Sequence, residues 1–575
     1  MNDQIDVPAK TRSTKRERLF AIVWVLALGG ITFFNQLGTI GLVDETEPLF
    51  VEAARQMTVT GDWITPYFNQ ATRFDKPPLI YWLMAIAFQI FGVNEWAARL
   101  PSAIAGTALV GFCFYVIKRL VPSRIAPYLG SAIVAFNLMT LFFGRLGYSD
   151  MVLSACFGGA LLSFFLGYVE SDLRWYRAFF VLMGLAVLTK GPVGVVLPSA
   201  IVILFLVWVR KLREVLRDMK PLQGIGIFLL VSVPWYVLAY IQNGNAFIQS
   251  FFGVHNVDRF TSVVNQHSGA WYYHLMIVLI GFFPWSLCLP ASIAYVLKPS
   301  KGKQEPRTRS RAPGAAQHFG EFALVWFAVV LIFFTIAVTK YITYTLPLYP
   351  AAAILVTLWF VHHFSQPQQS KWFKFTVYLS IITSIAIGIF IFYSPRWLNA
   401  DPAMPNLGLK IQHTGLQHIG ASIWITAAIV GLILAIQYQL RWYWAVNLVA
   451  FAAFILFFIT PTVSVIDSVR QLPLRQIAQG TIEDRRPNEP IVMATDAFEK
   501  PSLVFYTRQP ITFLNRAYMI QPYLSKLQKE GKTSSIVMIT TPTALLEGNV
   551  KPNQYQPLQQ YSQYQLVRVP IRASK

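Results

Sequence analysis

Acidic and basic side chains gather in one short polar stretch of an otherwise apolar chain. Asp44-Glu45-Thr46-Glu47-Pro48 follows the first apolar run, and Arg73-Phe74-Asp75-Lys76-Pro77-Pro78 comes soon after it. A carboxylate can take a proton from a hydroxyl nucleophile, and a lysine can bind phosphate oxygens through charge-assisted hydrogen bonds. The residue types in this stretch therefore fit acid–base chemistry beside an anionic group.

The rest of the composition is that of a membrane protein. Of the 575 residues, 55% are hydrophobic and 13% are charged, and the mean hydropathy is +0.47. Soluble proteins are about 25% charged. Apolar runs long enough to cross the ~30 Å core of a bilayer recur along the chain. The alternating pattern of a membrane β-barrel is absent, so we expect the spans to be helices.

About thirteen apolar runs qualify as membrane spans by their hydropathy. They lie at 19–40, 97–119, 126–143, 150–169, 174–190, 192–210, 221–241, 270–297, 319–338, 342–362, 372–393, 418–436 and 441–460. A further run at 79–93 follows two prolines and is shorter than a span. We expect that run to be interfacial or re-entrant.

The distribution of Lys and Arg predicts the orientation. Four basic clusters fall on one side of a thirteen-span chain, which is then the cytoplasmic side. They are Lys10–Arg18, Lys118–Arg124, Arg210–Lys220 and Lys298–Arg311. The net charge of +21 is explained by this bias and by attraction to membrane lipids, so we expect no nucleic-acid partner. The N-terminus is predicted to be cytoplasmic and the C-terminus periplasmic, in a bacterial inner membrane.

The composition changes near residue 461. Short β-branched segments, separated by helical patterns, predict a small periplasmic α/β domain over 461–575. The strands are expected at 491–493, 511–514, 536–539 and 566–569. Residues 1–460 are predicted to form the membrane domain, with 44–96 as a first periplasmic loop that contains interfacial helices.

Ionisable residues recur in five loops on the external face. Besides 44–76, these loops are 145–150, 189–192, 255–273 and 340–344. Ionisable groups at membrane depth are costly, so they usually line a functional cavity. An inverting sugar transfer needs a base on the face opposite the leaving group. When the leaving group is a phosphate, nearby cations stabilise its growing charge.

In order along the chain, these loops resemble the motifs of the GT-C superfamily of polyprenyl-phosphate-sugar transferases. The chain is most similar there to the bacterial aminoarabinose transferase of lipid A and to the protein O-mannosyltransferases. The residues that carry the resemblance are Asp44-Glu45, Phe74 to Leu79 with Tyr81-Trp82, Arg145 to Asp150, Thr189 to Pro192, His255-Asn256, Arg259 to Thr261, His267, Gly269, Tyr272-Tyr273, and Lys340-Tyr341 with Tyr344 and Pro347. The resemblance implies a GT-C fold and an enzyme that uses a lipid-linked sugar.

The same resemblance implies a role for particular residues. Asp44 would be the catalytic base with Glu45 beside it, and Asp150 would be a second essential acid. The groups that would hold the carrier phosphate are Lys76, Tyr81, Lys190, Arg259, Tyr341 and Tyr344. Asp75 and His255 would bind a divalent metal ion, although the family has Glu where this chain has Asp75. No other cofactor is implied.

Other interpretations of these residues remain open. Acids favour helix N-termini, so Asp44 and Glu45 could begin an interfacial helix and Asp150 could cap a span. Lys76 could be a lysine that extends toward the membrane surface. A lipid-linked sugar transporter or a non-catalytic scaffold is an alternative to the transferase. The acceptor could be a lipid such as lipid A or the Ser/Thr of a protein. The sequence identifies neither the sugar nor the oligomeric state.

Overall fold

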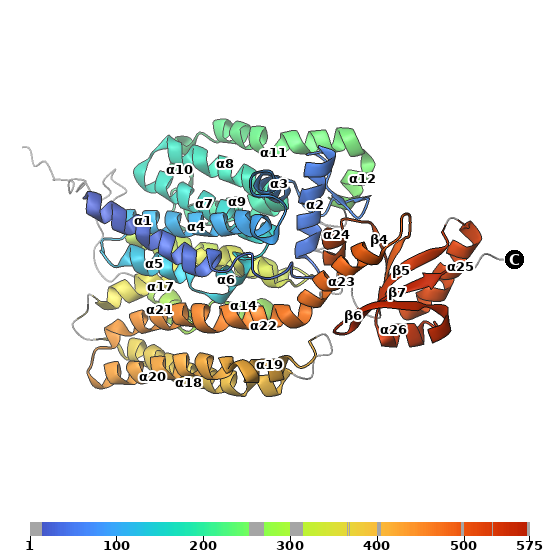
Figure 1. Ribbon diagram of the computed structural model, residues 1–575. Helices are drawn as coiled ribbons and strands as arrows, with labels where there is room; N and C mark the ends of the chain where they lie inside the picture. Colours follow the sequence, from blue (N-terminus) through green and yellow to red (C-terminus); the bar gives the residue numbers. More distant parts are fainter. Residues whose placement is uncertain are drawn as a thin grey trace, which may run out of the picture.

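A bundle of apolar helices carries a smaller sheet-containing domain at one end (Figure 1). The computed structural model describes residues 14–251, 253, 269–298, 314–364, 366, 369–398, 404–495, 499–531 and 533–571. The predicted class, a multi-span helical membrane protein with a small C-terminal α/β domain, is confirmed.

Nine helices in the described part of the chain are long and apolar enough to cross a membrane. They are α1 (Lys15–Gly29) with its continuation to Phe34, α4 (Glu95–Leu120), α7 (Ser149–Glu170), α11 (Pro221–Asn243), α16 (Ala315–Ile336), α17 (Tyr349–Phe364) with the turn Ile342–Leu348, α18 (Lys371–Tyr393), α20 (Leu416–Ile436), and the continuous helix Leu440–Arg470, which includes α21 (Tyr443–Phe454) and α22 (Thr460–Arg470). A bent pair, α14 (Tyr273–Gly281) and Ser286–Leu297 with α15 (Leu289–Leu297), could be a tenth.

The predicted number of thirteen spans is not confirmed, although every predicted run contains a helix. The run 126–143 is divided into α5 (Ala126–Ala135) and α6 (Leu138–Phe143). The side chain of Asn137 begins α6 by accepting the N–H of Thr140 at 2.9 Å, which an N-capping residue does. In addition, α8 (Leu173–Lys190) and α9 (Val193–Trp208) are not among the nine helices, because α8 carries three cations and α9 has only 16 residues.

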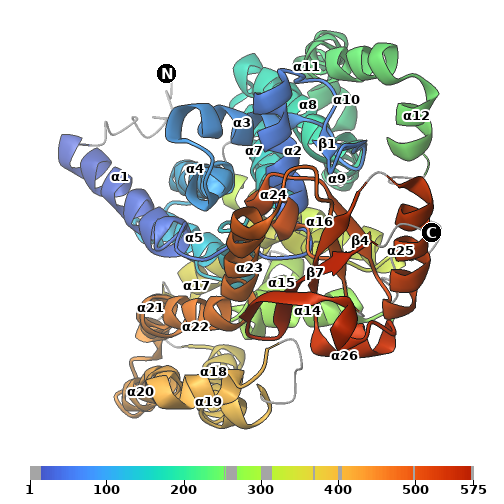
Figure 2. The same cartoon turned by 45° about the vertical axis from the view of Figure 1, so that its right-hand side comes forward.

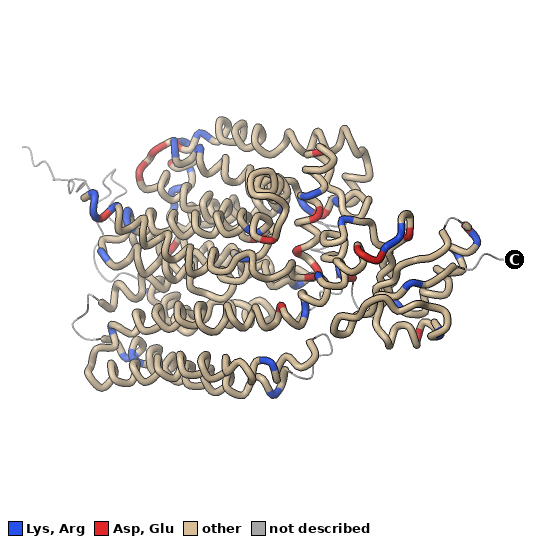
Figure 3. The backbone as a smooth tube through the Cα atoms, viewed as in Figure 1, with Lys and Arg blue, Asp and Glu red and all other residues tan. Residues whose placement is uncertain are grey.

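Charged residues lie mostly toward the two ends of the bundle, and the end that meets the C-terminal domain carries many of the acids (Figure 3). The apolar middle of the bundle is closely packed by aromatic side chains, among them Trp285, Trp326 and Trp424, which are fully buried. A bilayer favours this distribution, because ionisable groups at membrane depth are costly.

The loop between α1 and α4 is itself folded. It contains α2 (Glu47–Thr60), a small hairpin of β1 (Tyr67–Phe68) and β2 (Ala71–Thr72), and α3 (Leu79–Phe91). α3 and α2 pack through the rings of Phe50 and Tyr81, whose centroids are 5.7 Å apart. At 13 residues α3 is too short to span a bilayer upright.

A five-stranded sheet in the order β4-β3-β5-β7-β6 forms the core of the C-terminal domain. β3 is parallel to β4 and β5, whereas β7 is antiparallel to β5 and β6. The strands are β3 (Ile491–Ala494), β4 (Ile511–Leu514), β5 (Ser535–Thr540), β6 (Gln556–Tyr561) and β7 (Tyr564–Pro570). The sequence prediction located four of them and missed β6, whose residues are mostly polar and partly exposed.

Helices cover both faces of this sheet because its central strands are apolar on both sides. Val492 and Met538 pack with one cluster that includes residues of α25 (Ile520–Glu530) and α26 (Pro542–Glu547). Met493 and Ile539 pack on the other face, with α23 (Leu472–Asp484) and α24 (Ser502–Thr507). Shorter connecting helices elsewhere are α10 (Leu212–Met219), α12 (Asn245–Ile248) and α19 (Leu407–Thr414).

The C-terminal domain lies directly against the first loop. Figure 2 shows α24 next to α2 and α23 next to α24, and α24 contacts both of these helices. The last apolar helix runs without a break past residue 461 to Arg470, and α23 follows at once. The domain is thus joined to the bundle through a rigid helical segment.

Candidate active site

A buried ion pair fixes the acidic loop, residues 44–47, to the bundle. Arg99 on α4 is fully buried and its guanidinium donates to both carboxylate oxygens of Glu47 at 2.8 Å. The same guanidinium donates to the backbone carbonyls of Leu37, Ile40 and Gly41. Glu47 also accepts the N–H groups of Val43 and Gly147 at 2.7 Å. A buried charge needs such complete pairing, so this arrangement holds the loop in one conformation.

Asp44 lies in the loop that this ion pair holds, at the border with the C-terminal domain. Its Oδ1 accepts the N–H of Ser502 at 2.9 Å, and its Oδ2 accepts the hydroxyl of the same residue. Burial raises the pKa of the Asp44 carboxyl to about 6, and the bonds from Ser502 oppose that rise. The neighbouring Glu45 faces Lys500 of the C-terminal domain at 3.9 Å.

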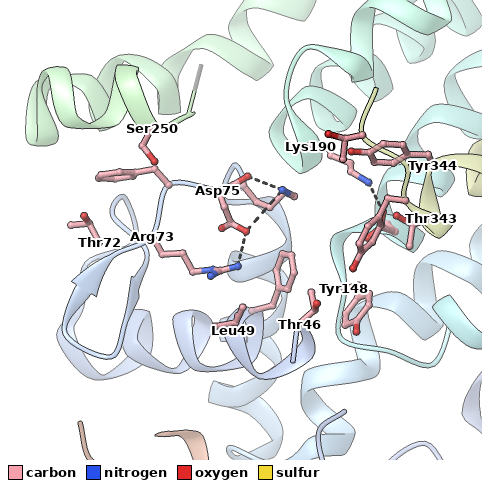
Figure 4. Close-up of a pocket in the computed structure, with 16 residues that line it drawn as sticks. Thr46, Leu49, Thr72, Arg73, Asp75, Tyr148, Lys190, Ser250, Thr343 and Tyr344 are labelled. Carbon is pink, nitrogen blue, oxygen red and sulfur yellow. Dashed lines mark hydrogen bonds and ion pairs between the residues drawn. The ribbon is translucent and has the colours of Figure 1, made fainter. Parts of the chain in front are cut away.

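A cavity of about 380 Å³ opens between the first loop and the ends of the helices α7 and α8. Its lining residues are Thr46, Leu49, Phe50, Thr72, Arg73, Phe74, Asp75, Lys76, Tyr148, Asp150, Lys190, Ser250, Thr339, Tyr341, Thr343 and Tyr344. Figure 4 shows Arg73 and Asp75 together on one side of the cavity and Lys190 with Thr343 and Tyr344 on the other.

Asp75 is at the centre of the first of these groups. It accepts a hydrogen bond from Arg73 at 2.6 Å and one from the hydroxyl of Tyr81 at 3.2 Å. The ammonium group of Lys76 is 3.9 Å from the same carboxylate and donates to the backbone carbonyl of Asp75 at 2.8 Å. Burial alone would lower the pKa of Arg73, but the carboxylate of Asp75 raises it above its ordinary value.

An ion pair between Asp150 and Lys190 forms the second group. Asp150 is in the first turn of α7 and Lys190 is the last residue of α8, so two antiparallel helix ends bring the charges together. The ammonium group of Lys190 also lies 5.4 Å from the ring centroid of Tyr344, within cation–π range. The lining has three cations and two carboxylates, a formal excess of one positive charge. That excess suits a singly charged phosphodiester.

The structure brings six of the predicted site residues into one cavity. They are Asp75, Lys76, Asp150, Lys190, Tyr341 and Tyr344. Tyr81 supports Asp75 without lining the cavity, and Asp44 and Glu45 face the C-terminal domain instead. His255 and Arg259 lie outside the described residues. Lys340, from the same predicted external cluster, donates to the carbonyls of Thr335 and Ala337 and so caps α16.

Two features of the site were not predicted. Arg73 was noticed in the sequence only as a neighbour of Asp75, and its ion pair supplies the third cation of the cavity. Ser502 lies 458 positions from Asp44, and a lone serine before a short helix has no sequence signal that points to a distant carboxylate. The adjacency of Arg73 to the acidic motif, in contrast, was a usable signal.

Of the predicted metal pair, Asp75 lies in the described part of the chain and is surrounded by hydrogen-bond donors. Its carboxylate is shared by a guanidinium, an ammonium group and a phenol, which are hydrogen-bond donors that compete with a cation. No cluster of three His, Cys, Asp or Glu side chains suited to a metal occurs among the residues described above. The donor set around Asp75 therefore does not by itself fit a resident metal ion.

Two segments match known protein families. Residues 75–238 match the family of dolichyl-phosphate-mannose-protein mannosyltransferases, and this segment contributes Asp75, Lys76, Asp150 and Lys190 to the cavity. Residues 484–575 match the C-terminal domain of cyanobacterial RgtA-type glycosyltransferases. Both matched families are glycosyltransferases.

Individual relatives are similar over more than half of the chain. The undecaprenyl phosphate-alpha-4-amino-4-deoxy-L-arabinose arabinosyl transferase of Aeromonas hydrophila is 29% identical over 338 residues, which are 58% of this chain and 59% of the relative. An uncharacterized protein of Aquifex aeolicus is 27% identical over 383 residues, which are 65% of this chain and 80% of that protein. The match to the first of these relatives thus spans less than two thirds of its length.

The solved structure of ArnT from Cupriavidus metallidurans bound to undecaprenyl phosphate has the same fold. It superposes with a TM-score of 0.74 at 21% identity and covers 97% of this chain and 98% of that one. The apo structure of the same protein gives a TM-score of 0.73. The GT-C fold expected from the sequence is thereby confirmed, including the association of a helical bundle with a C-terminal sheet domain.

Proposed function

We propose that this chain, whose fold and two matched domains are those of GT-C glycosyltransferases, transfers a sugar from a polyprenyl-phosphate donor to a hydroxyl of a lipid acceptor at the periplasmic face. The observation that carries the proposal is the cavity in which Arg73, Lys76 and Lys190 meet Asp75 and Asp150. It lies at the end of the bundle that carries the first loop.

The proposed reaction inverts the configuration at the sugar. The acceptor oxygen forms a bond to the anomeric carbon while the bond from that carbon to the phosphate oxygen breaks. The bonding electrons leave with the polyprenyl phosphate, whose new charge is stabilised by the cations of the cavity. The hydroxyl proton goes to the carboxylate of Asp44, which lies two residues before Thr46 of the cavity lining. No general acid is needed, because a phosphate monoester dianion is a good leaving group.

Asp150 acts in this proposal by holding Lys190. A lysine with four rotatable bonds is a flexible cation, and its ion pair with Asp150 and its position over Tyr344 fix the ammonium group at the cavity wall. Glu45, which pairs with Lys500, keeps the acidic loop against the C-terminal domain. Tyr341 and Tyr344 line the cavity beside these charges, and Arg259 is proposed as a further phosphate ligand.

A cation of the cavity should determine donor affinity. We expect Lys190→Met to weaken binding of undecaprenyl phosphate by about 10- to 100-fold, because it removes a charged hydrogen-bond donor. Titration calorimetry on the purified protein in detergent measures this affinity. Lys340→Met is the matched control, since Lys340 caps α16 and does not line the cavity. Equal affinities of wild type and Lys190→Met would remove Lys190 from the phosphate site.

We also propose a divalent metal ion at Asp75 and His255, in addition to the groups that carry out the reaction. It would bind a carboxylate that already receives Arg73 and Tyr81, so no step above depends on it. If a bound metal supports the reaction, EDTA lowers the transfer rate and added Zn²⁺ restores it. An unchanged rate after exhaustive chelation, with the metal content checked by mass spectrometry, leaves Asp75 only as the partner of Arg73.

The class of acceptor can be identified by an experiment in cells. A lipid A-like glycolipid is proposed first, and a protein hydroxyl is second because the family matched by 75–238 is named for protein mannosyltransferases. Mass spectrometry of lipids, glycolipids and glycoproteins from a deletion strain should show one class that lacks a single sugar, together with accumulation of the unused donor. Unaltered glycolipids and glycoproteins would contradict the proposal.

A reporter enzyme fused to the C-terminus tests the proposed periplasmic location of that end.

A further inference from the structure

The C-terminal domain reaches the proposed base directly. Ser502 is fully buried, and its N–H and its hydroxyl bind the two carboxylate oxygens of Asp44, one bond to each oxygen. Lys500, two residues earlier, faces Glu45. The described part of the C-terminal domain therefore contacts Asp44 and Glu45 through one short segment at the beginning of α24.

This contact is part of a specific interface. The side chain of Asn69 in the first loop donates to the carbonyl of Ile511 at 2.8 Å and accepts its N–H at 2.9 Å, and so it pairs with the edge strand β4. The hydroxyl of Tyr506 accepts the N–H of Leu42 and donates to Glu95, each at 2.9 Å. Bonds on both sides of Asp44 thus define how the domain is placed over the loop.

We infer that Ser502 is a positioning residue for the Asp44 carboxylate, so that the C-terminal domain completes the active site of the membrane domain. This inference rests on the proposed function. A carboxylate has about four acceptor positions. The two bonds from Ser502 occupy one position on each oxygen and oppose rotation of the group, and we assign one of the remaining positions to the proton of an acceptor hydroxyl. A base must be oriented in this way to act within hydrogen-bond reach.

A purely structural contact is the competing interpretation. Asp44 could serve only as a cap that accepts the free N–H at the beginning of α24 and so attaches the two domains. Loss of Ser502 would then lower the stability of the protein and lower transfer by the same factor at every pH. A positioning role predicts an effect that depends on pH, because the bonds from Ser502 act on the charged form of Asp44.

The charges around Asp44 determine the direction of that effect. Burial raises its pKa to about 6, whereas Ser502, and after it Lys500 and Arg470, lower it. Tyr564 of β7 also lies near Asp44, and it is neutral near pH 7 because the ordinary pKa of a phenol is about 10 and burial raises the pKa of Tyr564 further. The base works only when it is deprotonated, so the transfer rate of the wild type should rise with pH through about 6. Loss of the Ser502 hydroxyl removes the strongest influence that favours the charged form, and the rise moves to higher pH.

The test is the pH profile of transfer by the full-length protein in liposomes between pH 5 and 9. For Ser502→Ala we expect the midpoint to move upward by about one pH unit, which lowers the rate about 5-fold at pH 6 and very little at pH 8.5. Ser502→Thr keeps a hydroxyl and should restore the profile of the wild type. The matched control is Ser535→Ala, which removes a hydroxyl that donates to the buried carboxylate of Glu489 at 2.6 Å elsewhere in the same domain.

The possible results separate the inference from the proposed function. A Ser502→Ala profile that superposes on that of the wild type overturns the inference, and so does a rate that is reduced equally at every pH. An equal shift in Ser535→Ala also overturns it, because the effect would then not arise at Asp44. The proposed function fails by a different result, which is that the wild type itself transfers no sugar from polyprenyl-phosphate donors.

Discussion

Asp44→Asn should transfer sugar at least about 100-fold more slowly than the wild type, with folding and donor binding unchanged. The reason is that the amide cannot accept the proton of the acceptor hydroxyl. Asn has nearly the same shape as Asp, and its amide oxygen can still accept the N–H of Ser502 while the serine hydroxyl turns to accept from the amide. The interface with the C-terminal domain is therefore kept. Initial rates with a radiolabelled donor at pH 8 measure the loss.

Glu95→Gln is the matched control for this variant. The carboxylate of Glu95 accepts a hydrogen bond from Tyr506 in the same interface and is outside the cavity. The Glu95→Gln substitution removes one negative charge close to the loop without altering Asp44. We expect its rate to remain within a few-fold of the wild type. Wild-type turnover by Asp44→Asn would show that Asp44 is a structural cap and that the base is another residue.

The second large effect should follow from breaking the ion pair of Arg99 and Glu47. Arg99→Met leaves the carboxylate of Glu47 buried without its cation and leaves three backbone carbonyls without a donor. Breaking a buried pair in this way costs about 3–5 kcal/mol. We expect a clearly lower midpoint of thermal unfolding in detergent and a strong loss of transfer, because the loop that carries Asp44 loses its anchor.

Arg174→Met provides the comparison for this effect. Arg174 pairs with Asp172 at the beginning of α8, where its side chain is 86% exposed. Exposed ion pairs contribute little to stability, so the unfolding midpoint should stay that of the wild type. An Arg99→Met variant that unfolds at the wild-type temperature would show that the acidic loop is held by its other contacts.

The sequence was sufficient for the class of fold because apolar runs and basic loops report membrane spans directly. It was less informative where a run is interrupted. The break at Asn137 depends on a side chain that caps a helix inside an apolar segment, and neither the period nor the hydropathy of 126–143 reveals it. Arg99 was counted within the predicted span 97–119, and its role as the anchor of the loop depends on Glu47, 52 positions away.

The candidate site was predictable to the extent that its residues are ionisable and external. Lys76, Asp150 and Lys190 were identified because they stand in polar loops on the external face and match the motifs that the sequence resembles, and the structure places all three in the cavity. The same criterion selected Lys340, which instead satisfies the carbonyls at the end of α16. This criterion did not predict the contacts between the domains, since Ser502 is uncharged and its partner is known only after folding.

The central claim is that this chain transfers a sugar from a polyprenyl phosphate with inversion at the anomeric carbon. The most direct measurement reconstitutes the purified protein in liposomes with the lipid-linked sugar and the lipids that accumulate in the deletion strain. Mass spectrometry follows the release of polyprenyl phosphate, and NMR of the product gives its anomeric configuration. We predict stoichiometric release together with a glycosylated product of inverted configuration. A product of retained configuration, or a donor that remains intact, would contradict the account.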